Sequence, residues 1–357
     1  MSPSIRTVVA DRGDAGVRLD RVVRRHLTDL PAATRTRVQA WIAGGQVTVN
    51  GAPVRRVSAR AALGDLVAVV VPDPAPRRAM IAEPSPLAIL FEDEHLLAVD
   101  KPAGLVVHPT FRHATGTLMN ALLWHARGWP AGRRPSIVGR LDKLTSGIVL
   151  VAKTREVHAA LQRGAGGDPE GIALRRERVG RDAGRPLQGR HPTKDYLAIV
   201  YGRVPAVGAI DLGLALAARD RRRVVASAAG ARSVTEFERL ARAPAPRAGL
   251  AMLRCRLITG RRHQIRVHLA ARGWPIVGDP VYGEPLWMQI RDPMLAAALR
   301  AFPRQALHAH RLELTHPVTG DLVRIEAPLP ADMQSLIVCT GFGSEKTFQL
   351  LTSSGSC

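Results

Sequence analysis

A proline-rich stretch constrains this 357-residue chain more than any other feature. Prolines recur from Pro72 to Pro86, with Arg77 and Arg78 between them. Proline has a fixed φ and no amide donor, so helices and strands are disfavoured here. The stretch predicts a linker over 73–86 between two folded regions, 17–72 and 87–330, and the chain is long enough for both.

Composition narrows the class of protein. Hydrophobic residues make up 46% and charged residues 23%, and the sequence has no apolar run long enough to cross a bilayer, so we expect no membrane association. Lys and Arg total 51 against 30 acidic residues, a net charge of +21 that favours a polyanionic partner such as nucleic acid. Aromatic residues are only 4%, which disfavours binding mainly by base stacking.

The cysteines bear on location. Cys255, Cys339 and Cys357 are too dispersed for a metal knuckle and too few for a disulfide framework. This usage fits a reducing compartment, and the first residues carry no apolar stretch with a cleavage site. We therefore expect a cytoplasmic protein.

The first region predicts two short helices and a hairpin. Apolar residues recur at helical spacing from Leu19 to Leu27, and Thr34 is a candidate N-cap for a second helix. Alternating valines then lead to Asn50-Gly51, the dipeptide that best supplies the positive φ of a two-residue hairpin turn.

Arginines crowd this small region with few acids beside them, as on a phosphate-binding surface. A single such residue is more often part of a solvated helical face, but the cluster favours RNA or DNA contact. The candidate RNA-binding residues are Arg18, Arg21, Arg24, Arg25, Arg35, Arg37 and Arg55.

The second region predicts an α+β domain with a mostly antiparallel mixed sheet, since strands and helices do not alternate regularly. Residues 162–193, rich in Gly, Arg and Pro, predict a flexible surface insertion, and residues 331–357 predict a tail without regular structure. Strands are expected at 87–91, 96–99, 148–151, 197–201, 252–257 and 323–325, and helices at 155–161 and 263–272.

The densest polar motif runs from Gly139 to Gly147, just before a predicted strand. Asp142 lies between Arg140 and Lys143, and neighbouring positive charge favours an ionised carboxylate. Such a group in a cleft can act as a nucleophile or base. From these residues alone, an ordinary surface turn with a local ion pair is the slightly favoured interpretation.

A second polar segment, 259–269, runs from a strand end into a helix. Arg266 offers a planar fork for a carboxylate. His263 and His268 are five residues apart and do not share a helix face, so we predict no metal site. Tyr196 begins an apolar strand, where most tyrosines are packing residues.

Together these motifs resemble a known family. Residues 17–72 resemble the S4-type RNA-binding domain through Arg18-Leu19-Asp20, Thr34-Arg35-Thr36, the segment 45–51 and Gly64-Asp65. Residues 17–330 resemble the RluA family of pseudouridine synthases, in particular its large-subunit ribosomal RNA members. The supporting segments are 100–109, 140–142, 194–201, 259–269, 278–283 and 307–312.

The resemblance implies a role for each matched residue. It implies that Asp142 is the catalytic residue, that Arg266 pairs with it, that Tyr196 stacks on the target base and that Arg140 helps to hold open the RNA. The uridine must leave its stack before its glycosidic bond can be cut and rejoined through C5. The resemblance implies an isomerase that needs neither cofactor nor metal, and we expect a monomer.

The chain departs from the family pattern at Gly139, commonly His, at Leu144, often acidic, and at Arg262, commonly a small hydroxyl residue. These departures put substrate range in more doubt than chemistry. The alternatives are a non-catalytic RNA-binding ribosome-assembly factor and the same enzyme acting on tRNA. A hydrolase built on Asp142 is disfavoured by the charge and by the lack of an evident second carboxylate.

Overall fold

The computed structural model describes residues 4–30, 33–71, 80–110, 113–165, 192–220, 222–243 and 249–342. Its contacts divide the chain into two units, Met1–Ala79 and Met80–Cys357. This division falls within 73–86, where the sequence predicts the linker. Residues 80–87 form neither helix nor strand, and the rest of the linker lies outside the described residues.

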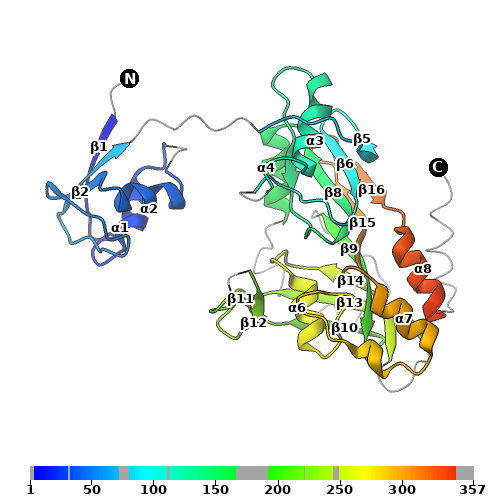
Figure 1. Ribbon diagram of the computed structural model, residues 1–357. Helices are drawn as coiled ribbons and strands as arrows, with labels where there is room; N and C mark the ends of the chain where they lie inside the picture. Colours follow the sequence, from blue (N-terminus) through cyan, green and yellow to red (C-terminus); the bar gives the residue numbers. More distant parts are fainter. Residues whose placement is uncertain are drawn as a thin grey trace. The chain divides into compact units, whose positions relative to one another are not determined.

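The first unit packs two helices on a four-stranded sheet of order β1-β4-β2-β3 (Figure 1). The hydroxyl of Thr34 accepts a hydrogen bond from the Arg37 amide and caps α2 as predicted. Asn50 and Gly51 have φ of 52° and 84° in the predicted hairpin turn. The elements are β1 (Ser4–Val9), α1 (Leu19–His26), α2 (Arg35–Ala43), β2 (Val47–Val49), β3 (Ala52–Pro53) and β4 (Leu66–Val71).

The second unit contains the remaining elements. Its helices are α3 (Leu118–His125), α4 (Arg155–Ala165), α6 (Gln264–Ala271), α7 (Pro293–Ala301) and α8 (Ala331–Thr340), with 3-10 turns at Ala126–Gly128 and Leu286–Gln289. Its strands are β5 (Ala88–Glu92), β6 (Leu96–Lys101), β7 (Ser136–Val138), β8 (Ser146–Ala152), β9 (Thr193–Tyr201), β10 (Val207–Asp211), β11 (Leu214–Leu216), β12 (Val224–Ala226), β13 (Val234–Ala243), β14 (Leu250–Leu257), β15 (Leu307–Thr315) and β16 (Leu322–Glu326).

One mixed sheet organises this unit. Its strand order is β10-β13-β14-β9-β15-β8-β6-β5, with β16 beside β15 and β7 beside β8. Every pair in this sheet is antiparallel except β15 with β8. The predicted α+β class with a mostly antiparallel sheet is therefore confirmed.

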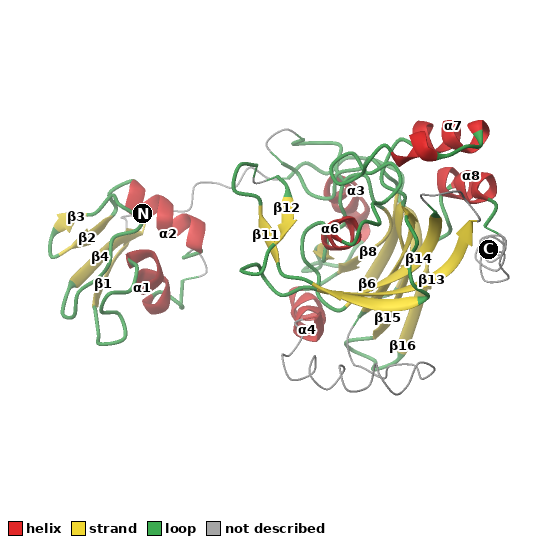
Figure 2. Ribbon diagram, turned by 90° about the horizontal axis from the view of Figure 1, so that it is seen from below, coloured by secondary structure: helices red, strands yellow, loops and turns green. Residues whose placement is uncertain are grey.

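The central strands are buried on both faces. Along β6 and β8, Leu97, Val99 and Val149 face a large core shared with α3, α6, α7 and α8. Leu96 and Ile148 face a smaller core that includes α4. Figure 2 shows α3 and α6 on one side of the sheet and α4 on the other.

The end of the chain corrects one expectation. Residues 331–340 do not form an irregular tail but the helix α8, which buries Met333, Leu336 and Ile337 in the larger core. This segment has few charged residues, so the sequence shows no clear polar face that would reveal the apolar face of a helix. Residues 343–357, and most of the predicted insertion 162–193, lie outside the described residues; residues 162–165 belong to α4.

Candidate active site

Asp142 lies on the loop between β7 and β8, and two buried cations hold the backbone of that loop. The Lys101 ammonium, fully buried, donates to the carbonyls of Pro102, Leu105 and Lys143 at 2.8, 3.1 and 3.1 Å. Arg304 donates to the Leu144 carbonyl at 3.4 Å. Burial lowers the pKa of Lys101 to about 8. Held backbone carbonyls fix the direction of a loop, so the carboxylate of Asp142 is presented from a rigid frame.

The loop ends where β8 meets β15. Gly147 has φ +106°, and a Cβ there would come within 2.2 Å of the Ala309 carbonyl oxygen, so only glycine fits this close approach. In the same ladder Ala309 pairs with Tyr196 of β9. The sheet therefore places Tyr196 on β9 and the end of the Asp142 loop at β8, on either side of β15.

Arg266, on α6, joins two carboxylates. Its Nη1 donates to Asp142 Oδ2 at 2.8 Å, and its Nε and Nη2 donate to Asp279 at 2.6 and 2.8 Å. Burial opposes the charge of Arg266, but the hydrogen bonds and charges of the two aspartates outweigh it and raise the pKa of Arg266 further. The predicted pairing of Arg266 with Asp142 is present in the structure.

Asp279 was missed as a second carboxylate. It lies within the segment 278–283, which supported the resemblance, but nothing in the sequence linked it to Arg266. Its side chain is completely buried and also accepts from the Val281 and Tyr282 amides at 2.9 and 3.0 Å. The Asp142 side chain is 19% exposed. Of these two carboxylates, only Asp142 is open to a substrate.

His263 and Tyr282 complete this group. His263 Nε2 lies 3.7 Å from Asp142 Oδ1, and its Nδ1 lies 2.8 Å from the Tyr282 hydroxyl. The Arg266 guanidinium lies over the Tyr282 ring at 5.0 Å. The sequence indicates His263 only as a candidate metal ligand. The position of His263 near Asp142 depends on its backbone conformation, which residue spacing does not reveal.

The other two candidate catalytic residues differ in placement. Tyr196 is only 5% exposed, and burial together with the charge of Asp142 raises the pKa of its hydroxyl. Arg140 is exposed and forms no ion pair with any acid in the described part of the chain. Burial and the charge of Arg140 lower the pKa of His108. Gly139, which precedes Arg140 in the chain, has φ +81°.

The predicted RNA-binding arginines fall into two sets. Arg18 and Arg35 lie 2.9 and 4.0 Å from the buried Asp20, which also accepts from Gln39 at 2.7 Å and so ties α1 to α2. Arg25 contacts Asp11 and Asp14 at 2.9 Å each. No described acid lies within 4.0 Å of the remaining four, which are Arg21, Arg24, Arg37 and Arg55.

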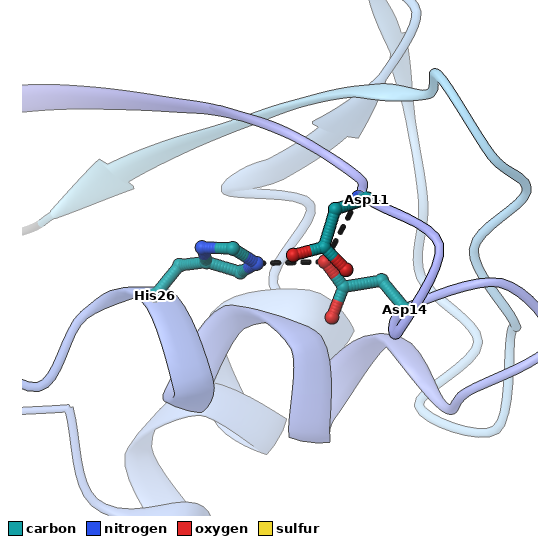
Figure 3. A group of neighbouring side chains, drawn as sticks. All are labelled: Asp11, Asp14 and His26. Carbon is teal, nitrogen blue, oxygen red and sulfur yellow. Dashed lines mark hydrogen bonds and ion pairs between the residues drawn. The ribbon is translucent and has the colours of Figure 1, made fainter.

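Asp11, Asp14 and His26 converge in the first unit as possible metal ligands (Figure 3). His26 Nε2 lies 2.7 Å from Asp14 Oδ2. The Arg25 guanidinium donates to both carboxylates, so a positively charged side chain already compensates their charge. We assign no metal to this group.

No helix among the described residues has the length and apolar character to cross a membrane.

Comparisons with known proteins identify the family of this chain. Residues 95–271 match the RNA pseudouridylate synthase family, and residues 17–67 match the S4 domain. The chain is 38% identical over 323 residues to ribosomal large subunit pseudouridine synthase D of Pseudomonas aeruginosa, covering 90% of this chain and 91% of that protein. It is 39% identical to the protein of the same name from Nitrosomonas europaea, over 90% of this chain and 84% of the other.

A solved structure supports the fold. Human RNA Pseudouridylate Synthase Domain Containing 1 aligns with 77% of this chain and 98% of its own, at 22% identity and a TM-score of 0.50. The chain thus belongs to the RNA pseudouridylate synthase family, as the resemblance predicted. It is an RNA isomerase that carries an S4 domain ahead of its catalytic domain.

Proposed function

We propose that this protein converts uridine to pseudouridine in large-subunit ribosomal RNA, with Asp142 as the catalytic carboxylate. The observation that carries the assignment of the residue is the group around it. Asp142 is partly exposed, is ion-paired to a buried arginine, and lies near the buried Tyr196. The names of the curated relatives support the target RNA.

The reaction breaks the bond between ribose C1′ and uracil N1, turns the freed uracil and forms a bond from C1′ to C5. C5 then loses its proton and N1 gains one, so the product is an isomer of uridine. The uridine is extruded from its stack first, because the reacting atoms are inaccessible in a stacked base. Asp142 then either attacks C1′ or removes a ribose proton to give a glycal-like intermediate. Arg266 donates to Asp142 Oδ2 and orients the carboxylate for both routes.

Three groups hold the substrate. Tyr196 offers an aromatic face to the extruded base, and its hydroxyl stays protonated because burial raises its pKa. Arg140 is exposed beside Asp142 and free to occupy the place of the extruded base. The unpaired arginines of the first unit bind phosphates and supply affinity without base readout.

The test uses large-subunit ribosomal RNA and tRNA transcripts labelled with tritium at uridine C5, since isomerisation expels this hydrogen. Wild type is compared with Asp142→Asn and Asp142→Ala, and the exposed Asp321→Asn serves as the matched control. We expect release from ribosomal RNA only, abolished in both Asp142 variants, with RNA affinity within about twofold of wild type because phosphate contacts are distributed.

Other results would revise the proposal. Release from tRNA alone would keep the chemistry and overturn the target. Release that persists in Asp142→Asn would overturn the role of this residue. Absence of release from both RNAs and from pre-ribosomal particles, with binding intact, would favour a non-catalytic RNA-binding factor.

A further inference from the structure

His263 has a backbone conformation that its side chain disfavours. It precedes α6 with φ 55° and ψ 19°, in the left-handed region. Among the described residues the only other non-glycine residue with positive φ is Asn50, in a hairpin turn that requires it. The side chain of His263 does not cap α6. Strain of this kind persists where the surrounding structure imposes it, often at functional sites.

This conformation directs the imidazole into the site. The His263 side chain is only 13% exposed, with Nε2 toward Asp142 Oδ1 and Nδ1 at the Tyr282 hydroxyl. The turn before α6 is itself fixed, because the Gln264 amide oxygen accepts from the Thr259 hydroxyl and the Arg261 amide at 2.8 and 3.0 Å. The ring is therefore held from its backbone as well as from its polar atoms.

The hydrogen bonds of Tyr282 select one tautomer. Its hydroxyl oxygen accepts from the Val224 amide of β12 at 2.9 Å. Its proton is then donated to His263 Nδ1, which leaves the ring proton on Nε2, facing Asp142. The opposite tautomer would direct a lone pair at the carboxylate and leave the tyrosine proton without an acceptor among the described residues.

We propose that neutral His263 is a positioning residue for Asp142: its Nε2–H faces Oδ1 at 3.7 Å and attracts it electrostatically, while Arg266 donates to Oδ2 at 2.8 Å, so that the carboxylate keeps a single orientation toward ribose. Tyr282 and the Val224 amide fix the tautomer that does this. The inference rests on the proposed function, in which Asp142 is the catalytic carboxylate.

The charged groups around His263 agree with a neutral ring. Asp142, Arg266, Arg262 and Asp279 all act on it, and their opposite effects partly cancel. Burial is the largest influence and lowers the pKa of His263 below 6.5. At acidic pH the ring gains a proton and pairs with Asp142 as an ion, which makes the carboxylate a poorer nucleophile or base. The wild-type kcat should therefore fall as pH drops through this pKa.

The decisive variants are His263→Asn and His263→Gly. Both accept the left-handed backbone more readily than histidine does, so loss of the ring is separated from strain. We expect kcat for tritium release to fall about 10- to 100-fold with KM within about twofold, because the contact orients Asp142 without binding RNA. Imidazole added to His263→Gly should restore part of kcat.

Two further variants complete the design. Tyr282→Phe, which removes the hydroxyl that bonds His263 and the Val224 amide, should lower kcat about three- to tenfold, since the imidazole itself is retained. His125→Asn, at the exposed His125–Glu92 pair, is the control for the same side-chain change and should retain wild-type kcat.

The pH profile decides between positioning and a merely structural role. The fall in kcat at acidic pH should shift or disappear in His263→Asn. A structural defect would instead lower kcat by the same factor at every pH. Wild-type kcat in His263→Asn, or a reduced kcat with the acidic fall unchanged, would overturn the proposal. Failure of the proposed function is distinguishable, because Asp142→Asn would then remain active.

Discussion

Two sets of arginines, one in each unit of this protein, have opposite surroundings. In the first unit Arg21, Arg24 and Arg55 are exposed and have no acid within 4.0 Å among the described residues. In the second unit the side chain of Arg266 is 5% exposed and that of Arg304 is 4% exposed, and both are paired with aspartates. Exposed, unpaired charge attracts a polyanion over a distance, whereas buried, paired charge orients its neighbours.

The difference predicts which quantity each arginine controls. A guanidinium that faces solvent contributes to RNA affinity and its salt dependence, and its removal leaves the fold intact. A buried guanidinium paired with aspartates is needed for geometry, and its removal leaves uncompensated charge behind. Substitutions in the two units should therefore separate binding, catalysis and stability.

The largest effect should come from Arg266→Lys. Lysine keeps the charge but cannot bridge Asp142 and Asp279 with a planar fork, so kcat should fall on the order of 10²- to 10³-fold. Tritium release under single-turnover conditions measures it. Arg324→Lys, at an exposed pair with Glu313, is the control. An Arg266→Lys enzyme with nearly full kcat would show that charge alone suffices.

Lys101→Met should come next, as a loss of stability. Three partly buried backbone carbonyls lose their donor, and the free energy of unfolding should fall by about 1–3 kcal/mol. Urea unfolding measures it, with the exposed Lys143→Met as control.

The pH dependence of stability should identify the same group. The pKa of Lys101 is about 8 in the folded chain against 10.5 for the free side chain, so between these values the unfolded chain binds more protons. Wild-type stability should therefore gain a rising contribution from pH 8 to 10.5. If the methionine variant shows the same rise, the contribution belongs to another group.

The smallest effect should come from the exposed arginines. The double variant Arg21→Gln/Arg24→Gln should weaken RNA binding about three- to tenfold near 0.1 M salt, with kcat unchanged. The slope of log binding constant against log salt concentration should become less steep by about one to two. Filter binding across a salt series measures both quantities. Arg25→Gln is the contrast, because Arg25 is paired with Asp11 and Asp14. Equal weakening by Arg25→Gln would contradict the division into paired and unpaired arginines.

Local sequence signals predicted much of the fold. Thr34 as a cap, Asn50-Gly51 as a turn and the apolar strand before Tyr201 depend on neighbouring residues, and the structure contains all three. Helix α8 and the pairing of β8 with β15 depend on contacts between distant segments, which no local pattern reports. The unpredicted elements are the ones whose stability comes mainly from tertiary packing.

The candidate site divides in the same way. Asp142, Arg266 and Tyr196 were named from motifs, and the structure brings them to one region. Asp279, Lys101 and Arg304 were not assigned roles, because their function is to satisfy another group's charge or carbonyl. The left-handed backbone of His263 could not be predicted from residue spacing, since residues other than glycine rarely adopt it.

The contacts that hold the Asp142 loop determine the order in which the two units can fold during synthesis. Ser146 is bonded to His308, 162 positions later, and the Leu144 carbonyl is held by Arg304, which pairs with Asp332 on α8. The helices and hairpin of the first unit need no such late residues. During synthesis, at about 5–20 residues per second, that unit folds before the residues that hold the Asp142 loop have been synthesised. The nascent chain therefore completes its RNA-binding unit before it completes its active site.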